Sequence, residues 1–179
     1  MNDQARDEET LRAGLEAHHA EGWSWALACC RGDATQAEDV LHLTYQKVLD
    51  GRARFEGRSS FKTWLFGVIR LTALDQRRFS WRRLLRWAPL SAADDRADPR
   101  PTLPDTLAGD ERCAAVQRAL AELTARQAEV LRLVFYHDLT LDEAAQAMGV
   151  SAGTARTHYE RGKENLRRRL AAPLSSSTS

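Results

Sequence analysis

Residues 139–163 constrain the fold more than any other segment, because they predict two short helices joined by a tight turn. Thr140 and Glu143 have the spacing of a capping box at the start of the first helix. Gly149 stands where this helix must end with a positive φ, and Ser151 can cap the second helix. Small residues occupy the expected crossing: Ala144, Ala145 and Ala155. The segment predicts a helix-turn-helix, whose second helix fits the DNA major groove, with an ordinary helical hairpin as the alternative.

The rest of the periodic sequence is also helical. A helix or pair of helices is expected within residues 8–30, and residues 33–38 hold two overlapping capping boxes, Asp33 with Gln36 and Thr35 with Glu38. The stripe that follows these boxes is Ala37, Val40, Leu41, Tyr45, Val48 and Leu49, with Gly51 ending the helix. A second stripe is Phe61, Trp64, Leu65, Val68, Ile69 and Thr72. No alternation typical of strands appears, so the sequence predicts an all-α fold.

The C-terminal half has its own helix signals. Asp110 is expected to cap a helix with an inward stripe of Val116, Ala119, Leu120 and Leu123. Thr124 with Gln127 predicts a capping box for the next helix, whose inward residues are Ala128, Leu131, Val134 and Phe135.

Residues 88–109 separate the two helical parts. Four of the five prolines and three aspartates fall between residues 89 and 104, where they oppose helix formation and leave little to bury. We therefore expect two small helical domains, residues 1–87 and 110–172, joined by a flexible Pro/Asp-rich linker over 88–109. A disordered tail is expected over 173–179.

The net charge of +1 conceals two basic blocks. Residues 51–87 carry a net charge of +8 and residues 151–179 a net charge of +4, whereas residues 1–50 carry −6. Two basic blocks, each on a plausible binding element, indicate two surfaces that contact nucleic acid.

Other classes of protein fit the sequence poorly. No apolar run reaches the ~18 residues of a membrane-spanning helix, and the acidic N-terminus does not resemble a secretory signal, so we expect no membrane insertion and a cytoplasmic location. The three cysteines and five histidines show no zinc-site spacing, and no nucleophile–base pair or phosphate-binding glycine loop is present. We expect no metal, no cofactor and no enzymatic activity.

Three segments together resemble a known family. The Ala-Glu-Asp-Val segment at residues 37–40, the Phe-x-x-x-Trp-Leu segment at 61–65 and the helix-turn-helix resemble the extracytoplasmic-function (ECF) group of bacterial sigma factors. The resemblance covers roughly residues 15–170. It implies a chain that binds core RNA polymerase, recognises two promoter elements in DNA and helps to melt the duplex, with an anti-sigma protein as a further partner.

The resemblance assigns three groups of site residues. The polymerase would be contacted by Glu38, Asp39 and His42, although His42 stands where glutamine is usual. The proximal element would be bound and melted by Phe55, Arg58, Ser59, Ser60, Lys62, Arg70, Leu71, Arg77 and Arg78, with Leu71 in place of a common asparagine. Phe61 and Trp64 are either core residues or base platforms, and their position on the apolar stripe favours the core.

The third group lies on the second helix of the helix-turn-helix and would read the distal element. Its members are Arg156, Thr157, His158, Glu160, Arg161 and Lys163. Arg156 is suited to reading guanine, and Arg161 and Lys163 are suited to binding phosphates. Glu160 would either accept from a cytosine amino group or pair with Lys163. A stand-alone DNA-binding regulator is the alternative function, and the basic block around Trp64 argues against it.

Overall fold

The computed structural model describes residues 3–87, 116 and 118–171. The chain divides into two compact units, Met1–Leu103 (the first unit) and Pro104–Ser179 (the second unit). The described residues form α-helices and turns without a strand, so the expected all-α fold is confirmed. The predicted linker, the Asp110 cap and the tail over 173–179 lie outside the described residues, and the exact domain boundaries stay predictions.

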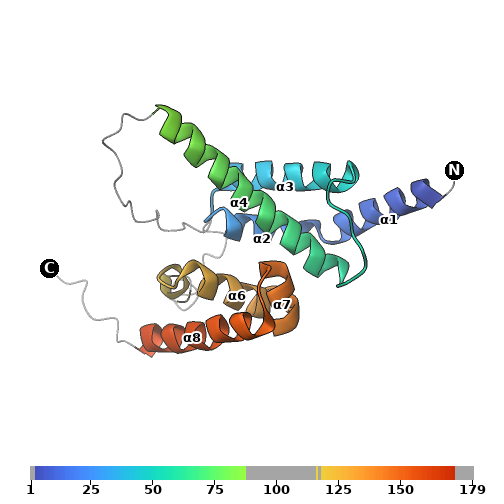
Figure 1. Cartoon of the computed structure of the whole chain (residues 1–179). Helices are drawn as coiled ribbons and strands as arrows, with labels where there is room; N and C mark the ends of the chain where they lie inside the picture. The colour runs from blue at the N-terminus through green and yellow to red at the C-terminus, as the bar shows by residue number, and fades with distance from the viewer. Residues whose placement is uncertain (1–2, 88–115, 117, 172–179) are drawn as a thin grey trace. The chain divides into compact units, whose positions relative to one another are not determined.

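Over residues 3–87, the first unit contains four helices, shown in blue to green in Figure 1: α1 (Asp3–Ala17), α2 (His19–Cys29), α3 (Ala34–Leu49) and α4 (Phe61–Trp87). Helices α2, α3 and α4 pack against one another, and α1 packs on α2 and α3. The largest side chains that are fully buried here are Trp25, Phe66, Leu65, Ile69, Val40 and Val48. The expected pair of helices near the N-terminus is confirmed.

Helix α3 begins as one of its two predicted caps requires. The Oδ1 atom of Asp33 accepts a hydrogen bond from the backbone N–H of Gln36 at 3.0 Å, whereas Thr35 lies inside the first turn. The buried face includes Thr44, whose hydroxyl donates to the carbonyl of Val40 at 2.8 Å. The prediction that Leu49 faces inward is wrong, because Leu49 ends the helix about 100° around its axis from the buried Val48 and is exposed.

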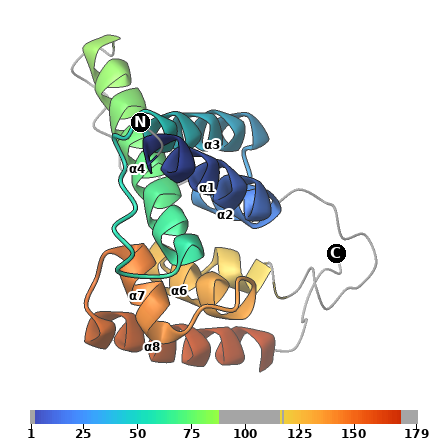
Figure 2. The ribbon, with the colours of Figure 1, turned by 90° about the vertical axis from the view of Figure 1, so that its right-hand side faces the viewer.

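The second unit contains α6 (Ala125–Phe135), α7 (Leu141–Met148) and α8 (Ala152–Ala171), and each of these packs on the other two (Figure 2). The capping box of α7 is confirmed: the Thr140 hydroxyl accepts from the N–H of Glu143 at 3.2 Å, and the Glu143 carboxylate accepts from the N–H of Thr140 at 2.9 Å. Gly149 ends α7 with φ of 64°. The Ser151 hydroxyl accepts from the N–H of Thr154 at 3.2 Å and starts α8. The helix-turn-helix is therefore present as predicted.

Two predictions for α6 are wrong. Thr124 precedes the helix but makes no capping hydrogen bond with its side chain. Gln127 is instead buried, and its Oε1 accepts a hydrogen bond from Nδ2 of Asn165 in α8 at 3.1 Å. Phe135, predicted to face inward, is 59% exposed because α6 ends there. Its ring stacks on Tyr159 of α8 with centroids 6.0 Å apart.

Helix α8 approaches α6 closely at Gly162. A Cβ atom on this residue would lie 3.1 Å from Cδ1 of Leu131 and 3.3 Å from Cβ of Gln127. Such distances are tighter than ordinary contacts, so a side chain here would require Leu131 and Gln127 to shift by a few tenths of an ångström. Gly162 and Ala155 are buried on the same side of α8, and this fixes which side of the helix faces outward.

Candidate nucleic-acid interfaces

The outward side of α8 carries the residues predicted to read the distal element. Arg156, Thr157, Glu160 and Arg161 are exposed, and His158 is half-buried. These positions follow the helical repeat opposite the buried Ala155 and Gly162. The structure therefore brings the predicted residues together on an accessible side of the second helix of the helix-turn-helix.

Glu160 and Lys163 form an intrahelical ion pair. The Nζ atom of Lys163 lies 3.1 Å from Oε2 of Glu160 and 4.5 Å from the centroid of the Tyr159 ring. The pairing with Lys163, one of the alternatives expected for Glu160, is present in the structure. This pairing compensates part of the Lys163 charge, whereas the exposed Arg161 lies one turn after Thr157 on the outward side.

Three aromatic rings meet between the loop of residues 52–60 and the start of α4; we call this group, Phe55, Phe61 and Trp64, the aromatic cluster. The centroid of Phe55 lies 5.4 Å from that of Phe61, with an edge-on geometry, and 5.2 Å from that of Trp64. Phe61 and Trp64 are half-buried, and Phe55 is 37% exposed. The favoured interpretation of Phe61 and Trp64 as core residues is therefore only partly right, since Leu65, Phe66 and Ile69 fill the core instead.

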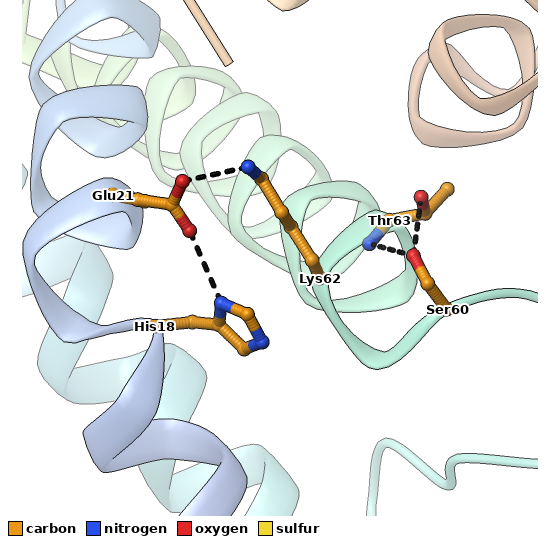
Figure 3. Close-up of polar contacts among 5 residues, drawn as sticks. All are labelled: His18, Glu21, Ser60, Lys62 and Thr63. Carbon is orange, nitrogen blue, oxygen red and sulfur yellow. Dashed lines mark hydrogen bonds and ion pairs between the residues drawn. The ribbon is translucent and has the colours of Figure 1, made fainter. Parts of the chain in front are cut away.

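The polar residues of this loop organise the start of α4. Ser60 caps the helix, because its Oγ accepts from the N–H of Thr63 at 3.2 Å and donates to the Thr63 hydroxyl at 2.8 Å (Figure 3). The Ser59 hydroxyl donates to the Ser60 carbonyl at 3.1 Å. Arg58 pairs with Glu56 at 2.8 Å while both side chains stay exposed. Of these residues, Arg58 presents a charged group to solvent.

Lys62 is bound within the protein. Its Nζ lies 2.6 Å from Oε1 of Glu21 in α2, and its side chain is only 19% exposed. The other carboxylate oxygen of Glu21 lies 3.1 Å from Nδ1 of His18, as Figure 3 shows. The hydrogen bond from Lys62 is the main cause that lowers the pKa of Glu21. The ammonium group of Lys62, predicted to contact DNA, is thus held by Glu21 in this structure.

Helix α4 divides the remaining predicted residues between its two sides. Arg70 is 6% exposed, because it continues the buried stripe of Phe66, Ile69 and Ala73. The phosphate contact expected of Arg70 therefore belongs to a residue that is buried in this structure, and it stays a prediction. Leu71 is 57% exposed, and Arg78 is also exposed, whereas Arg77 is half-buried.

The predicted polymerase-binding residues share the outer side of α3. Glu38, Asp39 and His42 are all exposed. Glu38 and Asp39 lie in the second turn of the helix, so the expected stabilisation of their carboxylates by the helix dipole is small. This side is separate from the buried residues Val40, Leu41 and Thr44.

Other kinds of site have little support among the described residues. Over residues 3–87, 116 and 118–171 no group of three or more His, Cys, Asp or Glu side chains could hold a metal ion. No helix in the described part of the chain has the length and apolar character needed to cross a bilayer. Cys30 is buried, and this burial raises the pKa of its thiol to about 11.

The residues that hold Lys62 were missed in the sequence. Glu21 and Lys62 are 41 positions apart, and nothing in the local pattern of either segment links them. The only signal was the charge difference between residues 1–50 and residues 51–87, which does not identify a pair.

Comparisons with known proteins agree with this architecture. Residues 15–83 match the family model for sigma-70 region 2, and residues 119–168 match that for sigma-70 region 4. The ECF RNA polymerase sigma factor SigX of Bacillus subtilis is 32% identical over 167 residues, which cover 91% of this chain and 84% of that protein. SigL of Mycobacterium tuberculosis is 29% identical, with 87% of this chain and 86% of SigL covered.

A solved structure has the same fold. It is the sigma factor RpoE in complex with the anti-sigma factor NepR from Bartonella quintana, with a TM-score of 0.72 and 22% identity. The match covers 92% of this chain and 99% of that chain. Because the two region models and a relative above 30% identity agree along most of its length, the chain belongs to the ECF group of RNA polymerase sigma factors.

Proposed function

We propose that this chain directs core RNA polymerase to promoters with two separated elements, and that it helps to open the DNA at the proximal one. The observation that carries the proposal is the half-exposed aromatic cluster beside a basic loop, in a chain whose other unit holds a helix-turn-helix. A region that melts DNA needs surfaces for unstacked bases and cations for the backbone. A stand-alone regulator needs only the helix-turn-helix.

The first unit binds the proximal element in this proposal. An unstacked base that lies on an aromatic face can gain about 1–3 kcal/mol, which is comparable to the cost of removing it from the duplex. Phe55 is the ring of the cluster that is most open to solvent. Arg58, Arg77 and Arg78 supply the positive charge for phosphates, with Ser59 and Ser60 in the loop that receives the base.

The second unit reads the distal element through the outward side of α8. Arg156 can donate two hydrogen bonds to a guanine in the major groove, and Thr157 and His158 flank it. Arg161 binds a phosphate and fixes the register of the helix. Because Lys163 already pairs with Glu160, its contribution to phosphate binding is smaller than that of Arg161.

Glu38, Asp39 and His42 contact the polymerase in this proposal. All three lie exposed on the outer side of α3. We further propose that an anti-sigma protein holds the chain inactive, as NepR binds RpoE in the structure named above.

A chain with two DNA-binding surfaces of modest affinity is expected to bind its promoter tightly only when polymerase holds both units in place. When both units are held at the promoter spacing, the second contact becomes intramolecular and avidity far exceeds either affinity. The free chain is therefore expected to bind duplex promoter DNA weakly.

In vitro transcription tests the proposal. Core polymerase from the same organism is mixed with the chain and with DNA from upstream of its own gene; we expect transcripts with one start site that are absent without the chain. A footprint of the free chain on duplex DNA is measured in parallel. No complex with core polymerase, together with a tight footprint of the free chain, would establish the stand-alone regulator instead.

A further inference from the structure

The first turn of α4 is held at three points by the corner where α1 meets α2. Glu21 binds Lys62 at 2.6 Å, as described above. The ring of His18, which also contacts Glu21, stacks on Phe61 with centroids 6.0 Å apart and an interplanar angle of 22°. Gly14 completes the contact, because a Cβ atom there would lie 2.8 Å from two atoms of the Phe61 ring.

These contacts reach the aromatic cluster through a shared residue. Phe61 is touched on one side by the α1–α2 corner and contacts both Phe55 and Trp64. A displacement of its ring must therefore disturb both of its neighbours in the cluster. Stacking of a base requires a surface that is already fixed before the base arrives, since ordering it later costs affinity.

We propose that Gly14, His18 and Glu21 are positioning residues for base capture at the aromatic cluster. They fix the Phe61 ring, and Glu21 keeps the Lys62 ammonium group on a carboxylate of the protein instead of a DNA phosphate. The inference rests on the proposed function of the cluster in promoter opening. The α1–α2 corner thus contributes to promoter opening by positioning the Phe61 ring, without itself contacting DNA.

Three variants of the ion pair test the proposal in holoenzyme assembled from core polymerase and the full chain. Open complexes are measured by permanganate reactivity of unpaired thymines on promoter DNA, alongside affinity for core polymerase and thermal stability. We expect Glu21→Gln and Lys62→Gln each to lower the yield of open complexes about threefold to tenfold, and the double variant to lower it no further. Core affinity should stay within about twofold, because the polymerase-facing side of α3 is unchanged. Glu16→Gln, which removes the same charge from the exposed side of α1, is the control and should match the wild type.

The opposite pattern would overturn the inference. If Lys62 binds a phosphate directly, Lys62→Gln alone weakens opening, and Glu21→Gln leaves it unchanged or strengthens it by releasing the lysine. Equal losses of open complexes and of thermal stability in every variant would indicate a purely structural role and would also overturn it.

A second test replaces a glycine and leaves the charge of the protein unchanged. Gly14→Ala pushes a methyl group into the Phe61 ring and should lower open-complex formation. The matched control is Gly22→Ala in α2, where the new Cβ would lie 3.4 Å from Cδ1 of Ile69, an ordinary contact. Wild-type opening in Gly14→Ala would count against the proposal. Failure of the wild-type holoenzyme to open DNA would instead refute the proposed function itself.

Discussion

The indole Nε1 of Trp25 donates a hydrogen bond to the backbone carbonyl of Phe66 at 3.0 Å, and the two rings stack with centroids 5.7 Å apart. Both side chains are fully buried, so this pair ties α2 to α4 at the centre of the first unit. A buried indole both fills volume and satisfies its own N–H, and a substitution can remove these two contributions together.

Trp25→Phe should therefore lower the free energy of unfolding of the first unit by about 1–3 kcal/mol, through the lost hydrogen bond and the cavity left behind. Urea denaturation followed by tryptophan fluorescence measures this change, because all five tryptophans lie within residues 23–87. Trp23→Phe, at a half-buried position, is the control and should cost less. An unchanged midpoint for Trp25→Phe would contradict the expectation.

Thr140→Ala removes the capping box of α7 and should destabilise the second unit by about 0.5–2 kcal/mol. Thr140→Ser keeps the hydroxyl and should retain most of the stability. Far-UV circular dichroism reports both units, whereas tryptophan fluorescence reports only the first. We expect the dichroism transition of Thr140→Ala to move to lower denaturant while the fluorescence transition stays in place; equal movement of both would be inconsistent with a local effect.

Substitutions of Arg156 and Arg161 should affect DNA binding in different ways, the first its sequence specificity and the second its overall strength. Arg156→Gln is expected to lower discrimination at one base pair of the distal element by about 1–3 kcal/mol. Arg161→Gln should weaken binding to all sequences about equally and reduce the log–log salt slope by about 0.9. Holoenzyme binding to a set of promoter variants at several salt concentrations separates the two effects. A uniform loss for Arg156→Gln would show that it binds the backbone.

Leu71→Asn should narrow base selection at the proximal element. Leu71 lies exposed on α4, where an amide can hydrogen-bond a base edge and leucine cannot. We expect a preference of about 1–3 kcal/mol at one position of the element, with stability changed by less than about 0.5 kcal/mol. Leu71→Ala removes the same side chain without adding an amide and is the control. The same base preference in both variants would exclude a direct contact by the amide.

Cys30 should make the first unit sensitive to alkaline pH. Burial raises the pKa of its thiol from 9.0 to about 11 in the folded protein, so the unfolded chain releases this proton first. The associated stability is complete below pH 9 and is lost as the pH rises toward 11, by up to about 2 kcal/mol. Urea denaturation of the wild type and of Cys30→Ala between pH 8 and 11 should show the wild type losing more stability. Parallel curves would show that folding does not raise the pKa of the Cys30 thiol.

Local signals predicted the helix-turn-helix best. Thr140, Glu143 and Gly149 act within one or two turns of their own helix, so their spacing alone determines their geometry. The failures arose where distant segments meet. The resemblance placed Lys62 among the DNA-binding residues, and its local sequence gave no sign that a carboxylate 41 positions earlier holds it.

The position of a residue around the axis of its helix, or at the end of the helix, explains the other predictions of burial that were wrong. Arg70 was grouped with the basic side of its helix, although it falls on the buried repeat of Phe66 and Ile69. Leu49 and Phe135 were placed inside because they are apolar, yet each is the last residue of its helix and is exposed. Leu49 lies about 100° around α3 from the buried Val48, and Phe135 is covered only in part by Tyr159 of α8. Where a helix ends relative to its neighbours is a tertiary property that a periodic stripe does not contain.

The absence of a side chain at Gly162 has a consequence for how such a chain can change its target. Because a Cβ atom there would lie 3.1 Å from Cδ1 of Leu131 and 3.3 Å from Cβ of Gln127, a larger residue obliges these neighbours to shift and disturbs the support of α8 on α6. If α8 reads DNA as proposed, exchanges of its outward residues can change the promoter preference one contact at a time, because they leave the packing of α8 on α6 unchanged.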